Sequence, residues 1–208
     1  MKLFQIEQCS GNTGCPNSLL DTEPLAQKLY KIAKLENIEE VIHSKIKGPI
    51  RQHHCFRVSI ANCPNACSQV QIKDVGIISK VKISIDMDKC SLCGKCVKTC
   101  FENALKIKEH TLTFNQGNCI GCGMCIKVCR EGAIKVIDKG FQILAGGKLG
   151  RHPMLALEIK NFTSFEECID IFKKILIYYK ENSIIGERLG TIFQRMKINE
   201  HSIKNLFT

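Results

Sequence analysis

The 208-residue sequence predicts an α+β fold in which a cysteine-rich module interrupts a domain made of helices and strands. Three observations lead to this prediction. Eight cysteines form two runs with C-x2-C-x2-C-x3-C spacing, apolar segments of strand length lie on both sides of those runs, and two longer segments have apolar residues at helical spacing. If the flanking strands share one sheet, the module is an insert rather than an appended domain. The expected boundaries are residues 86–138 for the insert and residues 1–85 with 139–208 for the surrounding domain.

A pair of cysteines with C-x5-C spacing, Cys9 and Cys15, comes before the first predicted helix. Asp21 can cap this helix, and Pro24 is suited to its first turn. We expect the helix to end near Asn37. Its apolar face consists of Leu25, Leu29, Ile32, Ala33 and Leu35.

Two strands are predicted around a second pair of cysteines. Residues 56–60 alternate apolar and polar side chains and lead into the C-x3-C pair formed by Cys63 and Cys67. Residues 75–85 again have the character of a strand. We expect a helix in the connection between these two strands.

The two C-x2-C-x2-C-x3-C runs are repeats, because Cys119 begins the second run 29 residues after Cys90 begins the first. Each repeat ends in a short apolar stretch, at residues 105–107 and 134–137. This order predicts a strand after a cysteine-bearing loop and a helical turn.

Another strand and a long helix are predicted after the module. Residues 141–145 have strand character and lead into a basic, glycine-rich loop at residues 146–153. Thr163 or Ser164 then caps an amphipathic helix. The apolar positions of that helix are Phe165, Cys168, Ile169, Phe172, Leu176 and Tyr179.

The spacing within the repeats is suited to iron–sulfur clusters. Three thiolates on a C-x2-C-x2-C loop can bind one [4Fe–4S] cubane, and the fourth cysteine of each run is directed to the other cluster. Gly94, Gly121 and Gly123 let the backbone approach and donate N–H groups to sulfur. Four-sulfur zinc sites instead combine two separated C-x2-C pairs, so zinc is a poor match. The expected ligand sets are Cys90, Cys93 and Cys96 with Cys129, and Cys119, Cys122 and Cys125 with Cys100.

This segment resembles the bacterial two-cluster ferredoxins. It departs from them where a proline usually follows the fourth cysteine, because Phe101 and Arg130 occupy those positions. Proline shapes the turn and is not a ligand, so two clusters remain the prediction.

Spacing alone leaves two interpretations of Cys9, Cys15, Cys63 and Cys67. They close a third cluster if the fold brings their two loops together, or they are unrelated buried thiols.

The residues around these four cysteines resemble the siroheme-dependent sulfite and nitrite reductases. The similarity lies in Cys9-Ser-Gly-Asn-Thr-Gly-Cys15 with Asp21-Thr22, in Cys63-Pro-Asn-Ala-Cys67 with Asp74-Val-Gly-Ile77, and in the loop Gly146-Gly-Lys-Leu-Gly-Arg-His-Pro153. The resemblance covers nearly the whole chain. It implies the siroheme-type α/β half of such a reductase, with the two-cluster ferredoxin domain inserted after the C-x3-C loop.

The resemblance also implies roles for individual residues. Cys9, Cys15, Cys63 and Cys67 would hold a third [4Fe–4S] cluster, and Cys67 would bridge it to the siroheme iron. Electrons would pass from the insert through this cluster to sulfite or nitrite bound at siroheme. The expected contacts are Arg57, Lys148 and Arg151 to the anionic substrate, and Asn65, Arg57 and Arg151 to siroheme.

Two departures from the family pattern weaken the catalytic interpretation. The family usually has a Lys-Phe-Lys pattern before the C-x3-C loop, where this chain has Cys55-Phe56-Arg57, and Asn62 stands where glycine is usual. Arginine keeps the charge of lysine but is a poor proton donor. The alternative is therefore a non-catalytic iron–sulfur electron-transfer protein or a subunit of a larger reductase.

Composition limits the other classes of function. The formal charge is +10, but three cubanes with four thiolates each would contribute about −2 apiece. Arginine-rich runs and interleaved aromatic residues are missing, so we do not expect nucleic-acid binding. Nor does any apolar run approach the roughly 18 residues of a membrane span, and we expect a cytoplasmic protein in a reducing, anaerobic environment.

The expected partners follow from the same resemblance. An electron donor protein must reduce the insert. Larger members of the family enclose siroheme between two lobes, and this chain corresponds to one of them. We therefore expect a compact single-lobe form, a homodimer, or one subunit that acts with a second reductase subunit.

Overall fold

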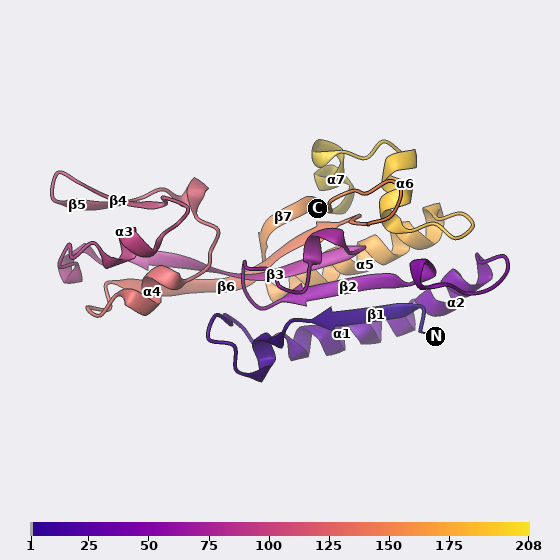
Figure 1. The fold of residues 1–208 in the computed structure, drawn as a ribbon, viewed down its shortest axis with the longest axis horizontal. Coiled ribbons are helices and arrows are strands. Elements are labelled where there is room, and N and C mark those ends of the chain that lie inside the picture. The colour runs from indigo at the N-terminus through magenta and orange to yellow at the C-terminus, as the bar shows by residue number, and fades with distance from the viewer. Residues whose placement is uncertain (1) are drawn as a thin grey trace. The chain divides into compact units, whose positions relative to one another are not determined.

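The computed structural model describes residues 2–208, which divide into two compact units (Figure 1). One unit runs to Ser79 and resumes at Phe141, and the other extends from Lys80 to Gly140. These limits are a few residues wider than the 86–138 predicted for the insert. In residues 2–208, no helix has both the length and the apolar character that a membrane span requires.

A five-stranded sheet, in the order β1-β2-β3-β6-β7, organises the first unit. Strands β1 and β2 are parallel, as are β2 and β3, whereas β6 and β7 are antiparallel. The parallel pairing makes the carboxyl ends of β1 and β2 coincide, which determines where the first pair of cysteines lies. The strands are β1 (Phe4–Gln8), β2 (Phe56–Ala61), β3 (Val75–Ile85), β6 (Ile134–Ala145) and β7 (Leu157–Thr163).

The first helix, α1 (Glu23–Leu35), matches the predicted segment except at its cap. Its N-cap position is Thr22 rather than the predicted Asp21, although Asp21 Oδ1 still accepts a hydrogen bond from the N–H of Glu23 at 2.9 Å. Thr22 is fully buried because its hydroxyl takes part in the cysteine loops described below. A short helix that was not predicted, α2 (Ile38–Ser44), follows at Asn37, whose φ of 51° breaks the helical path.

One face of the sheet carries the main hydrophobic core. Alternate residues of β2, namely Phe56, Val58 and Ile60, are at most 2% exposed and pack with α1 and α5 (Phe165–Asn182). Helix α5 begins as predicted, because the hydroxyl of Ser164 accepts a hydrogen bond from the N–H of Glu167. The helices α6 (Leu189–Arg195) and α7 (Glu200–Phe207), which were not predicted, complete this core through Phe193 and Phe207.

The other face of the sheet is covered by the connection between β2 and β3. The predicted helix there is wrong: the connection contains a single 3₁₀ turn, Val70–Ile72. The connection lies so close to β3 that a side chain at Gly76 would come within 2.4 Å of the carbonyl oxygen of Val70. A small apolar cluster formed by Ala61, Ala66, Val70, Ile78 and Leu144 seals the contact.

Strand β6 corrects another prediction. Residues 134–137 and 141–145 were expected as separate strands, because polar residues and Gly140 lie between them, but they form one strand of 12 residues. The first half is mostly exposed and the second half mostly buried, so the change in hydrophobicity reflects surroundings rather than a break in the backbone.

The second unit contains the two cysteine repeats. Short helices α3 (Lys95–Thr99) and α4 (Met124–Val128) follow the first two cysteines of each run and carry the third. Strand β4 (Leu105–Lys108) pairs in antiparallel fashion with β5 (Thr111–Phe114), which was not predicted. The repeat therefore has the predicted loop, helical turn and strand.

Candidate iron–sulfur sites

The loops of the two scattered cysteine pairs meet at the carboxyl ends of β1 and β2. Cys9 directly follows β1, and Cys63 lies two residues beyond β2. The N–H of Cys9 donates a hydrogen bond to the carbonyl oxygen of Ile60 at 3.1 Å, which extends the parallel ladder into the loop. Parallel pairing thus brings together two segments about 50 residues apart in the sequence.

Asn62, which is 1% exposed, connects these two loops. Its side-chain Nδ2 donates to the carbonyl oxygen of Leu20 at 2.8 Å and also to Asn12. Its Oδ1 accepts from the Thr22 hydroxyl at 3.1 Å and from the Cys9 thiol at 3.3 Å. All of this polar capacity is used inside the protein, so the relative position of the loops is fixed.

The four cysteines of these loops lie near one another. Burial raises the pKa of the Cys63 thiol, and the nearby Cys67, Cys9 and Cys15 raise it further, while an N–H from Asn65 opposes them. Cys63 is buried and Cys67 is exposed. The arrangement therefore favours one site made by all four cysteines over four unrelated thiols.

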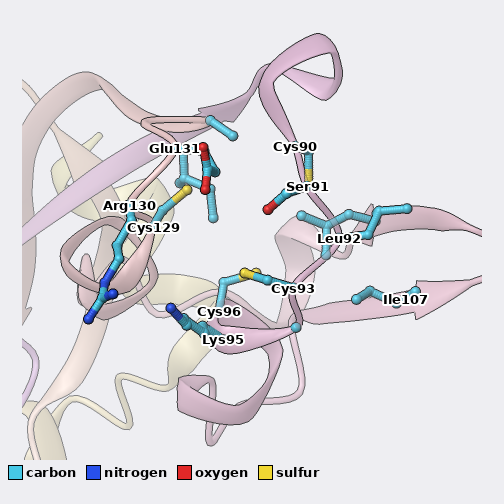
Figure 2. A pocket seen from close by; sticks show the side chains of 14 residues that line it. Cys90, Ser91, Leu92, Cys93, Lys95, Cys96, Ile107, Cys129, Arg130 and Glu131 are labelled. Carbon is cyan, nitrogen blue, oxygen red and sulfur yellow. The ribbon is translucent and has the colours of Figure 1, made fainter.

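In the second unit, one pocket is lined by Cys90, Cys93, Cys96 and Cys129. Figure 2 shows their sulfur atoms directed toward the middle of this pocket. An N–H from Lys95 is the main cause that lowers the pKa of Cys93, and burial raises that of Cys96. We call this group the first module set.

A second pocket is lined by Cys100, Cys119, Cys122 and Cys125. We call this group the second module set. Burial, reinforced by the neighbouring cysteines, raises the pKa of Cys125 to about 12. Each pocket thus combines three cysteines of one repeat with the fourth cysteine of the other, which is the crossed arrangement that the spacing predicts.

Within residues 2–208, no three His, Cys, Asp or Glu side chains lie close enough to hold a single metal ion. A cubane places different requirements on its ligands, since each of four thiolates binds a different iron atom at the edge of the cluster. Cysteines spread around a pocket meet that requirement better than a tight tetrahedral set would.

The predicted anion contacts have different surroundings. Arg57, the second residue of β2, lies on the same face as Ser59, whose hydroxyl donates to the carbonyl oxygen of Ser68, next to Cys67. The guanidinium of Arg57 donates to Gln52 Oε1 at 3.1 Å, but its Nε is buried without a hydrogen-bond partner in the described structure. Arg57 therefore retains an unused donor on the face covered by the Cys67 loop.

Lys148 is only 8% exposed, and its ammonium group donates to the hydroxyl of Thr191 at 3.2 Å. Burial lowers its pKa, and the positive charge of Arg188 lowers it further. Arg151 and Asn65 are exposed on their loops, in contrast to the buried Lys148.

A buried ion pair that was not predicted supports this basic region. The fully buried carboxylate of Asp74 accepts two hydrogen bonds from Arg188 Nε at 3.0 Å and one from the backbone N–H of Arg57 at 2.8 Å. Arg188 also donates to the carbonyl oxygen of Gly147 at 3.2 Å. The pair thus links the start of β2 to the loop that carries Lys148.

Sequence reasoning missed Asn62 and Arg188 as contributors to these sites. Asn62 was noted only as a departure from glycine, and Arg188 lies 114 residues from Asp74, in a segment without a motif. Its position just before a short helix, and between a glutamate and an apolar run, gave no local signal of a long-range ion pair.

Comparisons with known proteins identify the family of the chain. A family model described as the nitrite and sulphite reductase 4Fe-4S domain matches residues 2–202. The Coenzyme F420-dependent sulfite reductase of Methanocaldococcus jannaschii is 34% identical over 190 residues, which cover 90% of this chain and 28% of that protein. One subunit of the anaerobic sulfite reductase of Salmonella typhimurium is 31% identical over 100 residues, which cover 48% of this chain and 25% of that protein.

The fold itself resembles a solved structure. The crystal structure of dissimilatory sulfite reductase I matches with a TM-score of 0.68 at 18% identity, and the match covers 99% of this chain and 52% of that one. The chain spans about a quarter of the length of the curated relatives it matches. Because the family model extends over nearly all of the sequence, the chain belongs to the nitrite and sulphite reductase 4Fe-4S family.

Proposed function

We propose that this chain is the iron–sulfur half of a sulfite reductase, which conducts electrons through three [4Fe–4S] clusters to a siroheme site. One observation carries the proposal: the fold gathers twelve cysteines into three groups of four, and each of two pockets combines three cysteines of one repeat with the fourth of the other. Residues 80–140 would then be a two-cluster ferredoxin domain, and Cys9, Cys15, Cys63 and Cys67 would hold the third cluster.

Residues of the first unit are suited to siroheme, whose iron would bind the anion beside the third cluster and receive electrons from it one at a time. Siroheme carries carboxylates, which need cationic partners. Arg57 has an unused, buried Nε donor, and Lys148 has a buried ammonium group whose hydrogen-bond partner is an uncharged hydroxyl. Cys67, the exposed cysteine of its group, would be the residue that holds the haem iron.

The basic residues would also serve the reaction. Reduction of sulfite releases its oxygens as water and therefore consumes protons. Burial and Arg188 lower the pKa of Lys148, so its ammonium group gives up a proton more readily than an exposed lysine would. We assign proton donation to Lys148, and binding of the anion or of siroheme carboxylates to Arg57 and Arg151, with Asn65 beside Cys67.

A second candidate function has one specific observation in its favour. Cys55 stands where the family pattern has a lysine, and it is fully buried, with its thiol 3.6 Å from the carbonyl oxygen of Phe56. It is therefore unable to contact a bound anion. A non-catalytic electron-transfer protein would keep the three clusters but would not reduce sulfite.

The proposal includes partners. A second reductase subunit or a second copy of this chain would contribute to enclosing siroheme. An electron donor protein would reduce the module. We propose sulfite as the substrate, because the relatives are named sulfite reductases, and nitrite as the acceptor to compare with it.

Anaerobic purification followed by iron analysis and visible spectroscopy tests the proposal. Three cubanes and one haem iron give about 13 irons per chain, with siroheme bands in the spectrum. Sulfite should then oxidise the reduced protein. If about twelve irons are present without siroheme bands and sulfite has no effect, the electron-transfer function holds instead. Markedly fewer irons would refute both.

Cys67→Ser gives a matched test of the third site. The variant should lose the spectroscopic coupling between siroheme and its cluster, while the two module clusters remain. Cys55→Ser, at a buried cysteine outside all three groups, is the control and should keep that coupling.

A further inference from the structure

One of the positions at which the two cysteine repeats differ changes how their loops pack. Gly121, with φ of 73°, lies against β3: a side chain there would come within 2.9 Å of the carbonyl oxygen of Val81, and its own carbonyl accepts the N–H of Val81 at 3.0 Å. The equivalent residue of the first repeat is Leu92, which adopts φ of 53° despite its side chain. That conformation costs about 1 kcal/mol for a residue other than glycine.

The first loop therefore projects an apolar side chain where the second is packed against a strand. Figure 2 shows Leu92 and Ile107 side by side at one edge of the pocket of the first module set. Ile107 is 39% exposed and Leu92 is half-buried. Strained backbone that presents a side chain outward, rather than burying it, is typical of functional surfaces.

The cysteines of the first module set are also more exposed to solvent at one position than those of the second. Cys93 is exposed, whereas its counterpart Cys122 and the other cysteines of the second module set are half-buried. The pocket of the second set is also lined mainly by apolar residues, among them Phe114 and Met124. Since electron transfer between proteins becomes rapidly slower with distance, the exposed site is the better one at which to receive electrons.

The charge beside the exposed site is positive. Helix α3 and strand β4 contact each other; α3 carries two exposed lysines beside the pocket, and β4 carries two more on the face opposite Ile107. The exposed acidic residues nearby in sequence are Glu102 and Glu109, and the pocket of the first module set is itself lined by one cation besides Lys95, Arg130, and one carboxylate, Glu131. In the second repeat, the counterpart of Lys95 is the uncharged Met124. The lysines are Lys95, Lys98, Lys106 and Lys108.

We propose that electrons enter the chain at the first module set, from an acidic one-electron carrier protein that docks on Leu92, Ile107 and the α3 lysines Lys95 and Lys98. Apolar contacts in the centre with charges around them are the usual composition of a transient interface. Cys90, Cys93, Cys96 and Cys129 would hold the cluster that accepts the electron: in each encounter the carrier would lose one electron to it, and no covalent bond would form or break. The inference rests on the proposed function, because it requires the module to hold clusters.

Stopped-flow reduction of the anaerobic, cluster-loaded protein tests this inference, with the hydroquinone form of an acidic flavodoxin as the probe. The repeat provides a matched pair of variants, since Lys98 and Lys127 occupy equivalent positions. At low ionic strength, Lys98→Glu should slow reduction by about 3- to 10-fold, and Lys95→Glu similarly. Lys127→Glu should stay within about twofold, and the differences should vanish at high salt.

Control measurements distinguish a failure of docking from a failure of the proposed function. Iron content and reduction by dithionite should be unchanged in all three variants, because neither depends on docking. If Lys127→Glu slows the flavodoxin reaction as much as Lys98→Glu does, or if salt has no effect on the wild-type rate, docking at the first set is refuted. A protein without module clusters would instead refute the proposed function.

Discussion

The sulfur of Cys9 lies 3.3 Å from two atoms of Asn62: the backbone nitrogen, which donates to it, and the side-chain Oδ1, which accepts the thiol proton. If Cys9 binds iron as a thiolate, it can no longer donate to Oδ1, whereas the bond from the N–H becomes stronger. The hydroxyl of Thr22 still donates to Oδ1 at 3.1 Å. Asn62 is therefore suited to the loaded site as well as to the free thiol.

Asn62→Ala should loosen the C-x5-C loop. The substitution removes the bonds to Leu20, Asn12 and Thr22 and leaves buried polar groups without partners, which we expect to lower the free energy of unfolding by about 2–4 kcal/mol. Iron bound at the four-cysteine site should fall, while the module keeps its clusters. Anaerobic denaturation and iron analysis measure both effects. Asn65→Ala, at an exposed position of the C-x3-C loop, is the control. An equal loss of iron in this variant would show that the effect does not depend on Asn62.

Gly11 and Asn62 should show energetic coupling. A side chain at Gly11 would lie 2.3 Å from Cγ of Asn62, so the absence of one at position 11 makes room for the buried amide. We expect Gly11→Ala to destabilise the protein by about 1–3 kcal/mol. In the double variant Gly11→Ala/Asn62→Gly, the space is free again, and the total loss should be less than the sum of the single losses. Strict additivity would contradict the close packing of the two residues.

The elements that sequence analysis predicted well are those specified by short-range patterns. A run of three cysteines in seven residues followed by a fourth specifies a loop and a helical turn, and the 29-residue repeat from Cys90 to Cys119 specifies two of them. The crossed pockets follow from that symmetry. Likewise, alternation at residues 56–60 and the cap at Ser164 depend on neighbours in sequence.

Features that depend on distant contacts were not predictable in this way. The pairing of Arg188 with Asp74 spans 114 residues. The polar residues in the interior of β6 suggested a turn, but they are exposed residues of one continuous strand. The connection between β2 and β3 is too tightly packed at Gly76 for the expected helix. In each case tertiary packing overrides the local preference.

The crossed ligand sets can be distinguished from sets made within each run by two double variants. If Cys93 and Cys129 bind the same cluster, Cys93→Ala/Cys129→Ala should lose about four irons, because both substitutions affect one site. Cys93→Ala/Cys100→Ala would then affect both module sites and lose about eight. Anaerobic iron analysis compares the two proteins. The opposite order of losses would show that each run binds its own cluster.

The ion pair between Asp74 and Arg188 should depend on the shape of the guanidinium group. Arg188→Ala leaves a fully buried carboxylate without its charged partner, which we expect to cost about 3–5 kcal/mol. Arg188→Lys should recover only part of this, because an ammonium group cannot reproduce the paired contacts of Nε and the terminal nitrogen. Denaturation curves measure the losses. Full recovery with lysine would show that charge alone is sufficient.

Stability at alkaline pH should depend on Cys168, a fully buried cysteine outside all three groups. Burial raises its pKa to about 12 from the usual value near 9, so the folded state favours the neutral thiol. The stabilisation is complete below pH 9 and is lost as the pH rises toward 12, since the unfolded chain ionises first. At about pH 10 the loss is about 1.4 kcal/mol.

Cys168→Ala tests this assignment. The variant should be less stable at neutral pH, because the smaller side chain leaves a cavity, but its stability should fall about 1.4 kcal/mol less between about pH 7 and about pH 10 than that of the wild type. Anaerobic denaturation at the two pH values gives the difference. Native Cys168 should also resist alkylation until the protein unfolds, because both access and the thiolate are lacking. Equal pH dependence in the two proteins would mean that other groups, and not this thiol, set the alkaline limit of the fold.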